Sequence, residues 1–358
     1  MTAAGRRLPY ATLFLLALLG LGLSAAVALG IGSVDVPVPR VLAVVARRCG
    51  LGDAPFGGAP VSLLEDQLVW QLRLPRVLGA AAVGAVLAVC GAVLQSLTRN
   101  DLADPYLLGV SSGASVGAVA VIVFGSGWLA SLTAGTSLAG VSALALAAFV
   151  GALAALAAVL VIASGRTGTL APARTVLAGV AVSYLCTAWT SVAVLSAGDD
   201  GAARRVLTWT LGSMAGVRWE SAALLAGCAL GSVVLFSCFA DRLDGFTFGE
   251  LSARSLGVDV TATRWMLMVA TALVTAVAVA VTGAIGFVGL VVPHLVRPLV
   301  GHGHRRLLPT CALAGAILLL WADTAARSVL PSSELPIGAI TALVGVPVLV
   351  ILMMRRTT

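Results

Sequence analysis

The sequence predicts an all-α membrane protein whose chain crosses the bilayer about ten times. Of its 358 residues, 59% are hydrophobic and only 10% are charged, and the mean hydropathy is +1.06. A soluble protein of this length could not bury so much apolar surface, and runs long enough to span a membrane recur along the whole chain. We therefore expect one polytopic membrane domain over residues 1–358.

Charge and cysteine content exclude several other classes. The net charge of +7 comes from arginine alone, because the chain contains no lysine. In a soluble chain this excess would suggest nucleic acid; here it is typical of loops at a membrane surface, and no nucleic-acid partner is expected. The six cysteines form no CxxC pair and mostly lie in apolar runs, so neither a disulfide framework nor a metal site is predicted.

The first half of the chain contains five predicted spans. The run at about 10–31 follows Arg6 and Arg7. It is longer than the apolar region of a typical signal peptide, so we read it as a retained first span, with a cleaved signal peptide as the alternative. A polar excursion then precedes the core spans and contains an expected short helix at about 39–48. The other spans of this half are expected at about 76–97, 105–124, 138–163 and 175–196.

The second half adds five more spans around one charged interval. Residues 199–219 are less apolar and are expected outside the membrane, and the charged interval covers 241–264. The spans are expected at about 220–240, 265–282, 286–299 (short and broken), 307–326 and 336–354. Ten spans place both termini on one side, and we expect that side to be the cytoplasm.

The arginines do not all fall on the cytoplasmic face under this count. Longer excursions cross the membrane largely regardless of charge, so the positive-inside bias tolerates this distribution. A surplus on the outer face still needs a reason, and one reason is a docking surface for an acidic partner. The outer arginines are Arg40, Arg47, Arg48, Arg73, Arg76, Arg204, Arg205, Arg218 and Arg327.

Two predicted helices joined by a polar hinge make residues 73–117 the most informative stretch. Pro75 suits a first helical turn, where its missing N–H would have had no partner. Asp104 is placed to cap the next helix and Pro105 to begin it. That helix carries glycines four residues apart, a pattern that lets membrane helices approach closely.

Two later segments predict irregular helices. Glycines three apart at 283–289, followed by Pro293 and Pro298, predict a short broken helix, which membranes tolerate only where protein or a cavity covers it. Near the C-terminus, Pro347 predicts a kink in the last span. His294 could relay a proton or bind a metal, but a hydrogen bond to a neighbouring helix end or loop is the favoured interpretation.

No nucleotide-binding motif is present. A P-loop places a lysine on the phosphates, and a lysine-free chain cannot supply it. If the protein uses ATP, another polypeptide must hydrolyse it, so we expect no enzymatic activity and no cofactor in this chain.

The ordered pattern LRLPR…Q…N-x-LADP…LG-x-S-x-GA, with GAIGFVGL-x-x-PH-x-x-R and ELP-x-G…T-x-x-x-G-x-P further on, resembles the FecCD family of ABC-importer permeases. These permeases carry ferric siderophores, haem or vitamin B12. The resemblance covers nearly the whole chain. It implies a type II importer permease fold with two inverted repeats, at about 76–196 and 265–354. It also implies a homodimer with the pathway between two copies, two ATPase subunits that hold ATP and Mg, and one extracytoplasmic substrate-binding protein.

The resemblance implies a docking role for Arg73, Arg76 and Arg327, which would receive glutamates from the two lobes of the binding protein. Arginine suits this role because its rigid fork pairs bidentately with carboxylates. The alternative is that these arginines anchor the helices at the interface, with Arg327 merely paired to Asp323.

The charged interval resembles the family's GE-x-x-A-x-x-LG coupling segment, which fits a groove on the ATPase. An ordinary capped loop is the alternative. The matching positions are Gly249, Glu250, Ala253, Leu256 and Gly257. The residues that the resemblance assigns to helix packing or the pathway are Gln95, Asn100, Gly109, Ser112, Gly113, Gly117, Gly286, Gly289, Pro293, Pro336 and Gly345.

The hydroxyl groups expected along the pathway belong to Ser111, Ser112, Ser115, Ser183, Thr187 and Ser191. Two positions depart from the family pattern. Asp101 replaces a usual proline, which predicts a looser hinge, and Pro172 lies just before the fifth span, where the vitamin B12 relatives carry small hydroxyl residues at the inner gate.

The predicted function is ATP-driven import of a metal chelate by alternating access, with an iron–siderophore complex as the first choice of cargo and haem or cobalamin as alternatives. Two other classes stay open. Ser112 and His294 could form an intramembrane serine hydrolase pair. A proton-coupled secondary transporter would need a buried carboxylate, for which Asp323 is the candidate.

Overall fold

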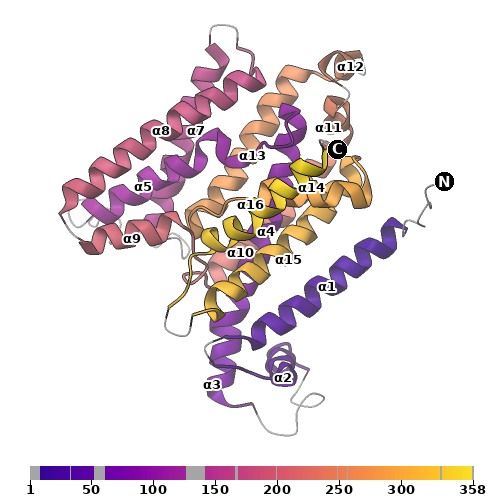
Figure 1. The fold of residues 1–358 in the computed structure, drawn as a ribbon. Helices are drawn as coiled ribbons and strands as arrows, with labels where there is room; N and C mark the ends of the chain where they lie inside the picture. Colours follow the sequence, from indigo (N-terminus) through magenta and orange to yellow (C-terminus); the bar gives the residue numbers. More distant parts are fainter. Residues whose placement is uncertain are drawn as a thin grey trace.

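The computed structural model describes residues 9–356 apart from 33, 52–60, 126–141, 166–167, 199, 248, 256 and 331–332. All regular elements within these residues are helices. Seven are long and apolar enough to cross a membrane, and three shorter apolar helices accompany them. These ten helices correspond one by one to the ten predicted spans, so the predicted all-α membrane fold is confirmed (Figure 1).

The long helices are α1 (Tyr10–Gly30), α4 (Leu74–Thr98), α7 (Ala143–Ser164), α8 (Pro172–Ala197), α10 (Trp219–Cys238), α13 (Val260–Thr282) and α15 (His304–Ser328). The shorter apolar helices are α5 (Val110–Phe124), α14 (Val288–Val300) and α16 (Ile337–Arg356). The connecting helices are α2 (Val38–Arg48), α3 (Leu63–Asp66), η1 (Gln67–Arg73), η2 (Pro105–Leu108), α9 (Asp200–Thr210), α11 (Ala240–Thr247) and α12 (Glu250–Ser255).

Helix α4 is the centre of the packing. It contacts α10, α13, α14 and α15, and most of its side chains are buried. A second group consists of α5, α7 and α8, which pack on one another and lie together at the left of Figure 1. Helix α13 contacts both α4 and α7, so it joins the two groups. Helix α1 lies at the edge of the molecule against α15.

Glycine allows the closest of these helix contacts. A Cβ atom on Gly91 of α4 would lie 1.9 Å from the carbonyl oxygen of Gly289 in α14, and one on Gly84 would lie 2.1 Å from that of Gly315 in α15. On α5, a Cβ on Gly117 would lie 1.9 Å from the Ala147 oxygen of α7. Each position therefore brings one backbone directly against another, as membrane helices without a hydrophobic driving force require.

Two local features differ from the sequence prediction. The helix of the second span begins near Leu63 rather than at Pro75, because a π-helical turn carries the chain into α4 with the Leu74 N–H bonded to Val69. The third span begins after a break: η2 ends at Gly109, whose φ of 73° interrupts the helix before Val110. Asp104 caps η2 as predicted, accepting from the Tyr106 N–H at 2.9 Å.

The two ends of the molecule are distinct. Tyr10 at the start of α1 contacts Arg306 at the start of α15, which in turn lies beside α11, and the C-terminal end of α16 lies near the same helices in Figure 1. We call this the coupling end. The opposite end holds the C-termini of α1 and α15, the start of α16 and the predicted docking arginines, and we call it the arginine end.

We expect Gly91→Ala to destabilise the protein, because its new methyl group meets backbone rather than a flexible side chain. Overpacking of this kind typically costs about 1–3 kcal/mol. Thermal unfolding of the detergent-solubilised protein measures the loss. The matched control is Gly227→Ala in α10, where a Cβ meets nothing within 4 Å. Equal melting temperatures for the two variants would show that the α4–α14 contact is not close-packed.

Candidate functional site

Two of the three predicted docking arginines, Arg76 and Arg327, converge on Asp323 in α15, whose side chain is 1% exposed. The Arg76 Nε and Nη2 atoms lie 3.0 and 2.9 Å from its two carboxylate oxygens. The same guanidinium group also holds Glu334, with Nη1–Oε1 and Nη2–Oε2 distances of 2.8 and 3.0 Å. Arg327 lies one helical turn beyond, with its Nε 3.8 Å from Asp323. One buried carboxylate therefore holds two arginines.

The other contacts of these arginines are internal to the chain. Arg73 donates to the carbonyl oxygens of Leu29 and Gly30, at 2.8 and 3.1 Å, and to that of Val34. Arg327 donates to the Ala28 oxygen. These carbonyls belong to the last turn of α1 and the residues after it, where a helix leaves its own acceptors unpaired. Arg73 and Arg327 thus cap α1, which agrees with the structural alternative and leaves the docking role a prediction.

An open cavity of about 520 Å³ lies against this cluster. Its polar lining comes from Arg73, Arg76, Arg218, Arg327 and Glu334, and its apolar lining includes Leu68 and Leu72. Arg218 is exposed and donates only to the Ala215 and Val217 oxygens in the part of the chain described.

A second cavity, of about 460 Å³, gathers the hydroxyl groups expected along the pathway. Its walls are α5, α8 and the ends of η2 and α9. It is lined by Tyr106, Ser111, Ser112, Ser115, Ser183, Thr187, Thr190 and Thr210. Five of the six predicted hydroxyl residues are in this set, and Ser191 is not. Ser112 Oγ lies 3.0 Å from Ser183 Oγ, which joins α5 to α8.

Hydrogen bonds from η2 and α4 hold the broken segment between α13 and α14 in place. The Tyr106 hydroxyl donates to the Ile285 oxygen at 2.9 Å and accepts from the Ile285 N–H at 2.8 Å. Gln95 Nε2 donates to the carbonyl oxygens of Gly289 and Leu290 at 3.3 and 3.2 Å. Two polar side chains therefore satisfy backbone groups that a helix interruption inside a membrane leaves open.

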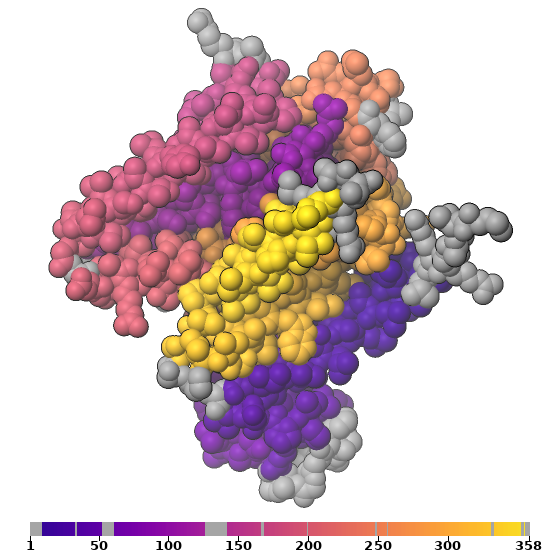
Figure 2. Space-filling view, viewed as in Figure 1, coloured from indigo at the N-terminus to yellow at the C-terminus, as the bar shows by residue number. Residues whose placement is uncertain are grey.

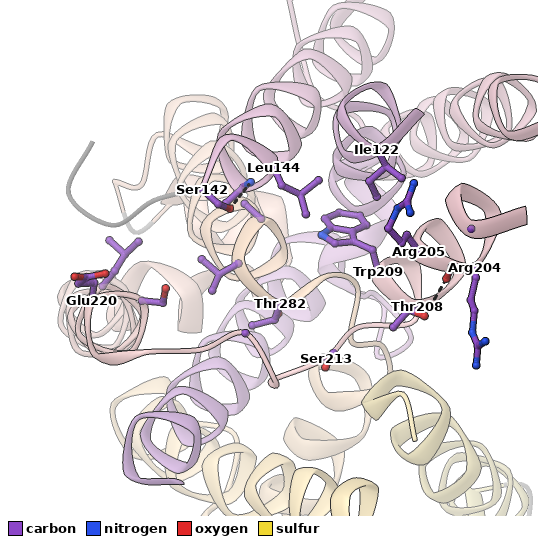
Figure 3. A pocket seen from close by; sticks show the side chains of 17 residues that line it. Ile122, Ser142, Leu144, Arg204, Arg205, Thr208, Trp209, Ser213, Glu220 and Thr282 are labelled. Atoms are coloured by element: carbon purple, nitrogen blue, oxygen red, sulfur yellow. Dashed lines mark hydrogen bonds between the residues drawn. The ribbon is translucent and has the colours of Figure 1, made fainter. Parts of the chain in front are cut away.

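A larger cavity, of about 880 Å³, lies at the arginine end between α9, α10, α13 and the start of α7 (Figure 3). Helix α9 contributes Arg204, Arg205, Thr208 and Trp209, and Trp209 lies near Arg205 and Ile122 in this view. This helix differs from the sequence prediction, in which residues 199–219 form an outer segment without an assigned helix. Its amphipathic spacing was the missed signal, with Ala202 and Val206 buried four residues apart.

At the coupling end, Arg264 of α13 connects three other elements. Its Nη2 lies 2.6 Å from Glu250 Oε1 in α12, and its Nη1 donates to the Leu170 oxygen just before α8 at 3.2 Å. Its guanidinium carbon lies 5.4 Å from the Phe246 ring of α11. Next to it, Trp265 Nε1 donates to the Gly168 oxygen at 3.1 Å. One side chain therefore connects α12 to the residues just before α8.

A second set of contacts, through His304 at the start of α15, connects α11 to α4. His304 Nδ1 lies 2.5 Å from Asp244 Oδ1, and its Nε2 lies 2.6 Å from Ser96 Oγ in α4. Burial alone would raise the pKa of Asp244, but its hydrogen bonds from His304 hold that pKa below its ordinary value. This Ser–His–Asp arrangement is structural, since His304 is 1% exposed and leaves no space for a substrate.

The remaining predicted residues fall in two places. Gly249 and Gly257, with φ values of 101° and 80°, flank α12, and Ala253 is fully buried in it; Leu256 lies outside the described residues. Two of the other positions lie at helix contacts: Gly113 meets Gly151 and Ala155 of α7, and Gly345 meets Phe287.

The last four positions lie elsewhere. Asn100 accepts a hydrogen bond from the Leu102 N–H, and Gly286 has open space beside it. Pro293 lies inside α14, and Pro336 precedes α16.

Known proteins share both sequence and fold with this chain. The model of the FecCD transport family matches residues 17–355. The chain belongs to the FecCD transport family. The vitamin B12 import system permease protein BtuC of Salmonella paratyphi A is 44% identical over 297 residues, which cover 82% of this chain and 86% of that protein. The BtuC protein of Vibrio cholerae is 43% identical over 295 residues, 82% and 85% of the two chains.

A solved structure extends the match to three dimensions. A putative metal-chelate type ABC transporter in an inward-facing conformation superimposes with a TM-score of 0.79 at 29% identity. The match covers 96% of this chain and 99% of that one. This FecCD protein is therefore a multi-pass inner-membrane permease subunit of an ABC importer, and its type II permease fold is confirmed.

The intramembrane hydrolase and secondary-transporter alternatives gain no support from this site. Ser112 is hydrogen-bonded to Gly109 and Ser183. Asp323, the candidate proton carrier, is paired with both Arg76 and Arg327.

Replacing Asp323 by Asn should strongly destabilise the FecCD permease, because Arg76 and Arg327 would lose a buried counter-charge. Breaking a buried pair in this way typically costs about 3–5 kcal/mol. The control is Asp241→Asn, which removes an exposed ion pair with Arg305 and should change the melting temperature little. If both variants melt alike, Asp323 is not the centre of the cluster.

Acid should weaken the attachment of α12. The hydrogen bond from Arg264 lowers the pKa of Glu250 below its ordinary value of 4.5, so the pair stabilises the fold above about pH 4.5 and loses this effect as the pH falls through the folded-state pKa. Wild type should therefore melt above Glu250→Gln at pH 7, and the difference should shrink below pH 4.5. A difference independent of pH would assign the effect to packing instead of charge.

Proposed function

We propose that this permease carries vitamin B12 across the cytoplasmic membrane as a homodimer with two ATPase subunits. The observation that carries the choice of cargo is the identity of about 44% to permeases named for vitamin B12 import. The first choice from the sequence, an iron–siderophore complex, rests on the frequency of that cargo in the family, and the two relatives described above are named for vitamin B12 instead. Both cargoes are bulky metal chelates.

The hydroxyl-lined cavity of about 460 Å³ supports a pathway for such a cargo. Serine and threonine can donate and accept hydrogen bonds without presenting a fixed charge, which suits a large ligand that must pass without binding tightly. Helices α8 and α16 are both visible on one face of the molecule (Figure 2). Helix α8 has exposed apolar side chains, among them Leu177, Leu185 and Leu195. We propose that a second copy covers part of this apolar face, so that the pathway forms between two permeases.

The coupling end is proposed to face the cytoplasm and receive the ATPase. In this proposal the ATPase holds ATP and Mg, and none of the chemistry occurs in this chain. Closure of the ATPase would move α12, and the Glu250–Arg264–Leu170 contacts would transmit that movement to α8. Alternating access then requires that ATP binding favours one of two arrangements of the dimer. The arginine end would face the substrate-binding protein.

Co-purification of the tagged permease from its native membrane tests the assembly. We expect a P-loop ATPase and an extracytoplasmic binding protein to be recovered, and we expect Glu250→Arg to lose the ATPase, because it places a cation against Arg264. Asp259→Arg, which changes an exposed helix cap in the same interval by the same charge, should retain it. Full transport activity of the chain alone in vesicles without ATP would refute the proposal.

The same complex in proteoliposomes distinguishes the cargoes. With the recovered binding protein, uptake of radiolabelled cyanocobalamin should depend on ATP and should compete with unlabelled cobalamin, but not with ferrichrome or haem. Uptake of ferrichrome in place of cobalamin would restore the siderophore prediction.

A further inference from the structure

The two carboxylates on Arg76 differ in a way that the docking prediction does not explain. Asp323 is 1% exposed and contacts both Arg76 and Arg327, so it belongs to the core of the cluster. Glu334 is 45% exposed, and its one ion-pair partner among the described residues is Arg76. It lies on the loop between α15 and α16 and faces the cavity of about 520 Å³. Because its side chain is already partly exposed, Glu334 can leave Arg76 for solvent, whereas Asp323 is held inside the protein.

The cavity also has more positive than negative charge. Arg73, Arg76, Arg218 and Arg327 line it, whereas Glu334 is the one carboxylate in its described lining and Asp323 lies behind. The Nε atom of Arg327 is buried without a hydrogen-bond partner in the described part of the chain. A bidentate carboxylate is the ligand that an arginine fork favours, so the site suits a further carboxylate in place of Glu334.

We propose that Glu334 occupies, within the chain, the position that a carboxylate of a docking protein takes, so that an acidic partner binds by displacing Glu334 from Arg76. This inference rests on the proposed function, which supplies such a partner at the arginine end. It accounts for the burial of Arg76, because in the undocked chain Glu334 already occupies the side of the guanidinium group that faces the cavity.

Displacement of Glu334 acts on the neighbouring backbone. The Leu335 N–H is bonded to Ala326 in α15 at 2.9 Å, and the Ile337 and Gly338 N–H groups are bonded to Gly212 and Leu211, just after α9, at 3.1 and 2.9 Å. The residue that the partner displaces thus lies directly before the segment that joins α15, α9 and α16. Docking would therefore alter the start of α16, which lies on the proposed pathway face.

The shielding of Arg76 can be tested on the purified full-length chain in lipid nanodiscs, without any partner. Phenylglyoxal modifies accessible guanidinium groups, and peptide mass spectrometry gives the rate at each arginine. Glu334→Gln should raise the modification rate of Arg76 several-fold and leave that of the exposed Arg218 unchanged. Glu220→Gln, which removes an exposed negative charge from the start of α10, is the control and should change neither rate. Equal rates at Arg76 in all three proteins would overturn the proposal.

Competition can be tested with the binding protein recovered in the co-purification. Glu334→Gln removes a partly exposed ion pair and should tighten binding by a factor of about 1.4 to 5, because a self-occupied site lowers apparent affinity. Glu220→Gln changes the net charge equally and should have less effect. Weaker binding by Glu334→Gln would mean that Glu334 positions Arg76 for the partner, and would overturn displacement.

The two experiments separate the inference from the proposed function. If no binding protein is recovered, the proposed assembly fails, while the labelling rates still decide whether Glu334 covers Arg76. If a binding protein is recovered and the Glu334 variant behaves as Glu220→Gln does, the assembly stands and displacement is wrong.

Discussion

Direct contact between helix backbones is the constraint on which this permease depends. Lipid surrounds apolar side chains as well as another helix does, so burial of leucine and valine cannot by itself hold α4 in the centre of the molecule. Glycines at Gly84 and Gly91 instead let α15 and α14 reach its backbone. The same device joins α5 to α7. Glycine forms these closest helix contacts. The polar clusters described above lie at the two ends of the molecule and along the proposed pathway.

The polar groups at the two ends are organised around single side chains. At the arginine end, Asp323 holds Arg76 and Arg327, and Arg327 also bonds the last turn of α1. At the coupling end, Arg264 holds α12 and the residues before α8. Each arrangement connects elements that are distant in the sequence. The proposed functions of the two ends, docking and coupling, therefore depend on contacts that also stabilise the fold.

Much of the fold could be predicted from the sequence, because apolar runs and turn residues report local structure directly. The ten spans, the short helix at 38–48 and the Asp104 cap are of this kind. The π-helical turn η1, which precedes Pro75, could not be predicted, because no residue preference in the sequence indicates it. Helix α9 was missed because its apolar stripe is short and surrounded by charge.

The site was less accessible from sequence than the fold. Resemblance to the family identified Arg73, Arg76 and Arg327, but spacing alone could not show that Arg73 bonds α1, which lies more than 40 residues earlier. Arg264 carried no motif at all, and its role depends on Leu170 and Glu250, which come together only in the folded chain. Hydroxyl residues on α5 and α8 were predictable as a set because each helix presents them at helical spacing.

Three glycines meet where α9 ends, α13 ends and α16 begins. A Cβ on Gly212, Gly283 or Gly338 would lie within 2.6 Å of a backbone oxygen from one of the neighbouring segments. This junction leaves no side chain to vary, whereas the nearby cavity walls consist almost entirely of side chains. Side chains of these walls, such as Ser112, Ser183 and Trp209, can therefore vary in size and polarity while the backbone contacts of the junction stay in place.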